Sequence, residues 1–389
     1  MTSRVSTADV FERDAPLFVE SATGRLPKYP RLWWTRWGLR LLIAAAYSGL
    51  AIWFNTAGGG DWSGTANAAL AERVHALRFD TSGVEVIGQI YPPITSLAAL
   101  LIPGGALGLS IAGAIVAAFM VQLLIQAQQR KGFHPIVRAV FTITLATTPM
   151  YTFVVTTNFE AAVGLMFFGL GMLDLVRFVT YANTQAGFRA GILFACSAFS
   201  DSNLVFSALV AAIGGALLIQ SRRKARFANA VVVAFPTLAL FAALALLGTA
   251  FGSGPFAMIR GSLSWDPVRA ETYVGIFATP LGWLYLAPIA VIVVTAIALR
   301  FPLTGLIAVL LAGSTALSYI LGLAPPGSSG TTFVLLLLVA VAIVPSSTTT
   351  AHRVLTSATA LVLWAIGWMT AFASAVVLAW MQTLGGTGS

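Results

Sequence analysis

The sequence predicts an all-α integral membrane protein, a polytopic bundle of about 11 transmembrane helices with a long outer loop after the first. Of the 389 residues, 58% are hydrophobic and only 9% are charged, whereas a soluble domain is about 25% charged. The apolar residues form blocks of roughly 20, which is the length that crosses a bilayer as a helix. A membrane β-barrel would instead show short segments of alternating hydrophobicity.

The apolar blocks place the predicted spans in chain order after a polar, basic tail over residues 1–36. The spans cover residues 38–54, 106–127, 136–155, 161–179, 190–200, 204–220, 228–250, 280–299, 303–323, 331–345 and 354–382. The span at 190–200 is short because the polar turn from Ser200 to Asn203 interrupts it. Pro149 falls near the outer end of the third span. Residues 37–389 are therefore expected to form a single transmembrane domain.

Two long polar stretches separate the spans, at residues 55–103 and 251–279. In the first, Ala66 to Leu77 has apolar residues at helical spacing, which predicts a helix lying on the membrane interface. Tyr91-Pro92-Pro93 ends any helix, and the apolar run from Thr95 to Ile102 is too short to cross, so a shallow or re-entrant segment is expected. Loops between spans are usually short, so a loop of this length indicates a function.

The basic residues orient the chain with its N-terminus in the cytoplasm. With alternating spans, 18 of the 22 Lys and Arg fall on the inner side, and four fall outside: Arg73, Arg78, Arg260 and Arg269. This asymmetry follows the positive-inside rule, so the net charge of +9 reports topology and not nucleic-acid binding. Eight of the 13 acidic residues fall outside, so any chemistry is expected to face outward. The Ala, Gly, Val and Arg usage favours a bacterial plasma membrane protein.

Four features follow one another within about the first 220 residues. Asp61 follows Gly60 after the first span, Tyr91-Pro92-Pro93-Ile94 follows in the same loop, a proline-bearing span leads to Glu160, and a Gly-rich span ends in a polar turn. In this order the chain resembles the GT-C superfamily, polytopic membrane glycosyltransferases that use polyprenyl-phosphate sugar donors. It departs from that pattern at residues 330–333, which lack the basic residue often found there, and at Trp62, where some families have a second acid.

The resemblance implies roles for two carboxylates. Asp61 would be the general base that takes the proton from the acceptor hydroxyl; alternatively, it only caps the following helix. Glu160 would position the acceptor or, in metal-using members, a divalent cation; alternatively, it is an acidic residue favoured at a helix N-terminus. Beyond that cation, no cofactor is expected.

The donor phosphate needs a cation, and an arginine suits it because the guanidinium can donate two parallel hydrogen bonds. Arg260 and Arg269 lie in the second outer loop and are the first candidates, with Arg73 and Arg78 as rivals. The alternative is that Arg260 and Arg269 pair with nearby Asp266 or Glu271 across a helical turn.

Several other outer residues fit a sugar-binding site. Trp62 and Tyr91, with Trp265 and Tyr273, can stack on sugar faces or anchor the chain at the interface. His75 is the outer histidine and can shuttle a proton or simply lie on a helix surface. Asp201, at the end of a broken helix, lines a cavity or belongs to a polar turn.

Three function classes remain open from the sequence. The first is an inverting glycosyltransferase that moves a sugar from a polyprenyl-phosphate lipid to a cell-envelope glycan or glycolipid on the outer face. The second is a lipid or glycan transporter or flippase, although few charges fall within the predicted spans. The third is a non-catalytic membrane subunit of envelope synthesis. All three imply contact with membrane lipid, and none implies nucleic acid.

Overall fold

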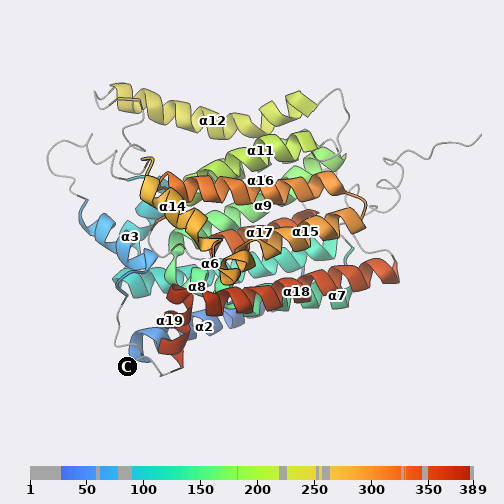
Figure 1. The fold of residues 1–389 in the computed structure, drawn as a ribbon, viewed down its shortest axis with the longest axis horizontal. Helices are drawn as coiled ribbons and strands as arrows, with labels where there is room; N and C mark the ends of the chain where they lie inside the picture. The colour runs from blue at the N-terminus through green and yellow to red at the C-terminus, as the bar shows by residue number, and fades with distance from the viewer. Residues whose placement is uncertain are drawn as a thin grey trace, which may run out of the picture.

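A computed structural model describes residues 28–57, 62–77, 90–130, 132–181, 183–218, 226–250, 254–255, 263–325, 328, 330–343 and 349–385. Every regular element in these ranges is a helix (Figure 1), so the predicted helical class is confirmed for the described part of the chain. Six of these helices are long and apolar enough to cross a membrane, or seven if one bent pair counts as a single span. The chain is therefore a multi-pass membrane protein by the length and composition of its helices.

The six long helices coincide with predicted spans and run side by side along the length of the bundle (Figure 1). They are α2 (Trp33–Ala57), α6 (Gly105–Arg130), α9 (Phe159–Tyr181), α12 (Arg226–Ala250), α16 (Pro302–Ile320) and α18 (Thr350–Ala373). Helix α2 begins at Trp33, within the stretch that the sequence assigned to the polar tail. Large apolar side chains face outward on these helices, for example Phe227 and Leu246 on α12, as expected where lipid replaces water.

Two predicted spans are broken. The span at 136–155 is two helices, α7 (Pro135–Thr147) and α8 (Pro149–Thr157), bent by 54°. Pro149 begins α8 because a proline fits the first turn of a helix but cannot donate the hydrogen bond that would continue α7. The span at 354–382 is α18 followed by α19 (Ala375–Leu384), with Ser374 in an extended conformation between them.

The predicted number of 11 complete spans is not confirmed, because several apolar helices are short. These are α10 (Thr184–Ala198), α11 (Val205–Leu218), α15 (Ala287–Ala298) and α17 (Thr331–Ile343). The predicted span at 280–299 begins as a 3₁₀ helix, η3 (Pro280–Tyr285), before α15. Helix α17 is apolar all round and is buried from Val334 to Ala342, which is typical of a central core helix.

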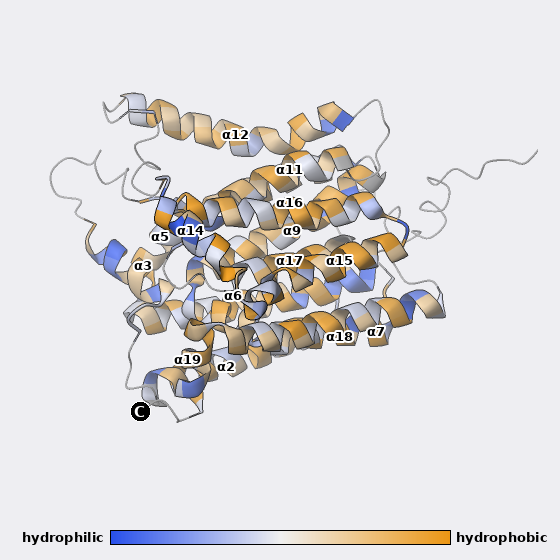
Figure 2. Ribbon diagram, in the orientation of Figure 1, coloured by the Kyte–Doolittle hydropathy of each residue, from blue (hydrophilic) through white to orange (hydrophobic). Residues whose placement is uncertain are grey.

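Glycines allow the central helices to approach closely. A Cβ on Gly171 of α9 would lie 2.9 Å from the Phe194 ring of α10, and a Cβ on Gly187 of α10 would lie 2.7 Å from the Phe178 ring of α9. In lipid the hydrophobic effect does not drive helices together, so transmembrane helices associate largely through van der Waals contact. Small residues at these positions let the helices approach closely enough to make such contact. Figure 2 shows the most hydrophilic residues toward the two ends of the bundle and apolar residues along its length.

We expect Gly113→Ala to lower the thermal stability of the purified protein. Gly113 lies on α6 against α8, where a Cβ would overlap the Val155 carbonyl oxygen, and overpacking of this kind costs about 1–3 kcal/mol. Gly313→Ala on α16 is the control, because nothing lies within 4 Å of a Cβ at that position. Equal melting temperatures of the two variants in detergent would contradict this close packing.

Candidate functional site

The candidate site lies at the end of the bundle where α3 (Ala66–His75) packs (Figure 1). Helix α5 (Pro93–Leu101), the start of α9, and the 3₁₀ helix η1 (Ser202–Leu204) meet there. The segment predicted to lie on the interface and the short apolar run after Tyr91-Pro92-Pro93 are thus both helices, although α5 begins at Pro93. Thr65 caps α3 by accepting a hydrogen bond from the Ala68 amide.

Asn67 fixes α3 to the body of the protein. Its Oδ1 accepts a 2.7 Å hydrogen bond from the Phe159 amide at the start of α9, and its Nδ2 donates to the Ser110 hydroxyl at 2.9 Å. The side chain is fully buried, so both hydrogen bonds are shielded from water. Sequence reasoning missed Asn67, because an asparagine in an amphipathic helix carries no signal for a distant partner.

Arg73, further along α3, forms an ion pair with Glu160. Its Nη2 lies 2.5 Å from Glu160 Oε1 and 3.3 Å from the Ser96 hydroxyl of α5. The Glu160 side chain is 3% exposed and that of Arg73 is 32% exposed. A buried carboxylate requires such a partner, and the N-terminus of α9 adds a favourable dipole. Glu160 is therefore held in place, while about a third of the Arg73 side chain remains exposed.

Asp201 is the second carboxylate of the site and lies between α10 and η1, outside both helices. Its Oδ1 accepts a 2.9 Å hydrogen bond from the Asn203 amide, and its Oδ2 is buried without a hydrogen-bond partner. Burial, and secondly the charge of Glu160, raise the pKa of the Asp201 carboxyl to about 7. Hence Glu160 and Asp201 are close enough to influence each other.

The Tyr-Pro-Pro segment is tied to the turn that follows α10. Three hydrogen bonds join them: Tyr91 Oη to the Ala198 carbonyl at 3.0 Å, the Ile94 amide to the Phe199 carbonyl at 3.0 Å, and Thr95 Oγ1 to the Ser200 carbonyl at 2.7 Å. Two of the features that carry the resemblance, about a hundred residues apart, therefore meet. We refer to Arg73, Tyr91, Glu160 and Asp201 as the α3 cluster.

The Tyr91 ring is buried in this arrangement and packs edge-on against Phe199 at 6.1 Å between centroids. Burial, followed by the charges of Asp201 and Glu160, raises the pKa of the Tyr91 phenol well above its ordinary value. Tyr91 thus remains a neutral hydrogen-bond donor that positions the segment. In this conformation its face is covered and does not offer a surface for sugar stacking.

The structure does not bring Trp62, His75 or Arg269 into the α3 cluster. Trp62 donates a 2.9 Å hydrogen bond to Asn55 and packs against Phe54, which fixes the start of the loop to the end of α2. His75 is exposed in the last turn of α3. Asp61 and Arg260 lie outside the described residues.

Arg269 lies on α14 (Pro267–Ile276), which packs against α16. Its Nε is 3.4 Å from Asp266, and both side chains are well exposed. Asp266 also caps α14 by accepting a 2.9 Å hydrogen bond from the Val268 amide. This geometry agrees with the alternative interpretation of Arg269, in which its side chain forms an ion pair with an acidic residue one helical turn away.

Within the described ranges, no group of three or more His, Cys, Asp or Glu side chains could hold a metal ion. The resemblance implies that Glu160 positions the acceptor or a divalent cation; in the structure, one of its carboxylate oxygens pairs with Arg73.

Comparison with known proteins gives no match: no family model matches the chain, and no curated protein or solved structure is significantly similar to it.

We expect Arg73→Gln to destabilise the protein, because it leaves Glu160 buried without a cation. Breaking a fully buried pair costs about 3–5 kcal/mol, and the partial exposure of Arg73 lowers our expectation to about 1–3 kcal/mol. Thermal unfolding of Arg73→Gln, of Glu160→Gln and of the double variant Arg73→Gln/Glu160→Gln measures the coupling between the two side chains. The double variant should be more stable than the sum of the single effects; simple additivity would contradict the pair.

We expect the stability contributed by Asp201 to fall as pH rises. An unfolded aspartate titrates near pH 3.9, whereas burial raises the pKa of folded Asp201 to about 7. Between these values the folded protein holds a proton that the unfolded chain has lost, so the free energy of unfolding falls from about pH 4 to pH 7. The melting temperature of the wild type minus that of Asp201→Asn should decline over this interval; a rising difference would contradict the burial of this carboxyl.

Proposed function

We propose that this protein is an inverting membrane glycosyltransferase of the GT-C type. It would work in a bacterial plasma membrane with its N-terminus in the cytoplasm, and would transfer a sugar from a polyprenyl-phosphate donor to an envelope glycan or glycolipid on the outer face. The observation that carries the proposal is the α3 cluster. In it, an arginine with an open side and two buried carboxyl groups are assembled by the same loop, turn and helix start that carry the resemblance.

In the proposed reaction, Asp61 takes the proton from the acceptor hydroxyl as its oxygen attacks C1 of the sugar. The bond between C1 and the phosphate oxygen breaks, and the electron pair leaves with the polyprenyl phosphate. Because the attack comes from the face opposite the leaving group, the configuration at C1 inverts. A positioned general base of this kind accelerates a reaction by about 10²–10⁴-fold.

Arg73 is the better candidate for the donor phosphate than Arg269. Glu160 and Ser96 fix its Nη2, while about a third of the side chain remains exposed, so an anion can approach the guanidinium from the open side. Arg269 also pairs with an acid, Asp266, but it lies on α14 and not on the elements that carry the α3 cluster. Pre-positioning by Glu160 reduces the entropy that Arg73 loses when it binds phosphate.

Asp201 supplies a buried carboxylate oxygen, Oδ2, that lacks a hydrogen-bond partner among the described residues. A buried oxygen without a hydrogen bond is uncommon in native proteins and is often satisfied by water or a ligand. Because burial raises its pKa to about 7, this carboxyl can hold or release a proton near neutral pH, so it can either donate or accept a hydrogen bond. In the proposed reaction it orients the acceptor.

The test is transfer or hydrolysis of a radiolabelled polyprenyl-phosphate sugar by the purified full chain in lipid nanodiscs. Asp61→Asn should lower the rate by about 10²-fold or more, the share of a general base. Asp266→Asn is the matched control, because Asp266 is an exposed acid that caps α14, and it should retain the rate.

Other outcomes would overturn the proposal. Full activity of a folded Asp61→Asn protein would remove Asp61 from the mechanism. Movement of the intact lipid across the bilayer without cleavage of the sugar would indicate a flippase. The absence of both activities across a panel of polyprenyl-phosphate sugars would favour a non-catalytic subunit.

A further inference from the structure

A second charged cluster lies toward the opposite end of the bundle, where α6 and α9 end and α10 begins. Asp174 on α9 accepts from Arg177 at 3.2 Å and from Arg189 on α10 at 2.7 Å. Arg130, the last residue of α6, is near enough to interact electrostatically with all three. We call these four residues the arginine cluster. It carries three positive charges around one carboxylate.

The arginine cluster opens to the surrounding medium on one side. Asp174 and Arg177 are 5% and 10% exposed, but the Arg189 side chain is 47% exposed. The four side chains bring together three guanidinium groups and one carboxylate, whose formal charges sum to +2. Guanidinium groups bind phosphate oxygens well because they donate paired hydrogen bonds.

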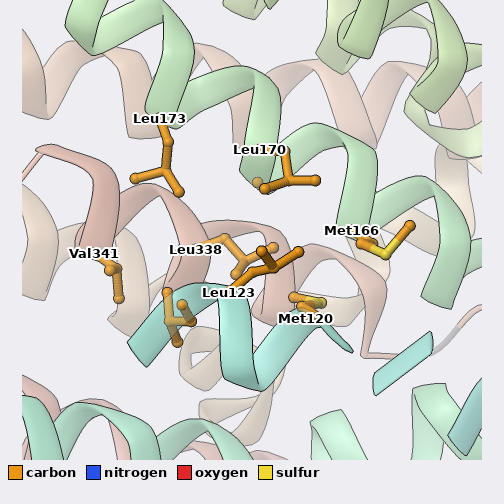
Figure 3. A pocket seen from close by; sticks show the side chains of 9 residues that line it. Met120, Leu123, Met166, Leu170, Leu173, Leu338 and Val341 are labelled. Atoms are coloured by element: carbon orange, nitrogen blue, oxygen red, sulfur yellow. The ribbon is translucent and has the colours of Figure 1, made fainter. Parts of the chain in front are cut away.

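An apolar crevice lies between α6, α9 and α17. Figure 3 shows Met166, Leu170 and Leu173 of α9 on one side, with side chains of α6 and α17 on the other. Its other walls include Met120 and Leu123 of α6, Gly169 of α9 and Leu338 of α17. The lining includes no charged or polar side chain, so the crevice suits a hydrocarbon chain.

Helices α6 and α9 each contribute to both the crevice and the arginine cluster. On α9, Leu170, Leu173 and Arg177 are spaced three and four residues apart, so they follow one face. On α6, Met120, Leu123 and Arg130 are spaced three and seven residues apart, which again places them on one face. The apolar stripe of each helix therefore ends in an arginine at the same end of the bundle.

We propose that this region binds an anionic glycerophospholipid, with one acyl chain in the apolar crevice and the headgroup phosphate on the arginine cluster. Basic pockets between transmembrane helices on the cytoplasmic side bind anionic headgroups in this manner, and the positive-inside count places this end of the bundle in the cytoplasmic leaflet. The site is separate from the α3 cluster, and it does not depend on glycosyl transfer.

The test is native mass spectrometry of the full chain in neutral detergent, titrated with phosphatidylglycerol or with phosphatidylcholine of the same acyl chains. The wild type should bind phosphatidylglycerol more tightly. Arg189→Gln should weaken that binding about fivefold, the effect of one basic residue near an anionic lipid. Arg269→Gln is the matched control, because Arg269 is similarly exposed at 40% but lies on α14, and it should bind as the wild type does.

A second variant tests the crevice. A Cβ on Gly169 would lie 3.5 Å from Leu338, an ordinary contact, so Gly169→Leu places its bulk in the crevice and should weaken binding of both lipids. The proposal is overturned if the two lipids bind equally, if Arg189→Gln matches Arg269→Gln, or if filling the crevice has no effect. Displacement by inorganic phosphate as effectively as by the lipid would also overturn it.

The wild type provides a readout that does not require a variant to fold. Raising the NaCl concentration should weaken phosphatidylglycerol binding and leave phosphatidylcholine binding unchanged, because salt screens partly exposed charges. Equal salt responses of the two lipids would contradict a headgroup held by the arginine cluster.

Discussion

The ion pair between Arg73 and Glu160 is the interaction on which the α3 end of the molecule depends. Glu160 is almost completely buried at the start of α9, and an unpaired charge there would cost several kcal/mol. Arg73 can reach it because Asn67 anchors α3 to the first amide of α9. The neutral side chain of Asn67 thus holds α3 where Arg73 can pair with the buried carboxylate.

At the same end of the bundle, two segments that lie about a hundred residues apart in the sequence are joined by hydrogen bonds. The Tyr-Pro-Pro segment cannot continue a helix, and it uses its backbone and side chains to satisfy the carbonyl groups that α10 leaves open at its end. Helix ends must find such partners where water is scarce. The hydrogen bonds hold Asp201 beside Glu160, so the termination of one helix also creates the second carboxyl group of the candidate site.

Sequence reasoning anticipated much of the fold and only part of the site. Hydropathy located the long spans, because a lipid-facing helix must be apolar along its length. It could not detect the break at Ser374, since a serine in an apolar stretch does not specify its backbone conformation. Glu160 and Asp201 were recognised singly, but the partner of Glu160 depends on how α3 docks, which no local pattern records. Likewise, Asp174 and Arg189 meet only through the packing of α9 on α10.

The shortness of α17 has a consequence for the peptide groups at its ends. With 13 residues, it rises about 20 Å, whereas the hydrocarbon layer is about 30 Å thick. A helix of this length cannot reach both surfaces of the layer, so at least one of its ends must find its hydrogen-bond partners among neighbouring helices or buried water. Because lipid tails cannot bond to peptide groups, the helices packed around α17 are what keep so short an element stable in the core of the bundle.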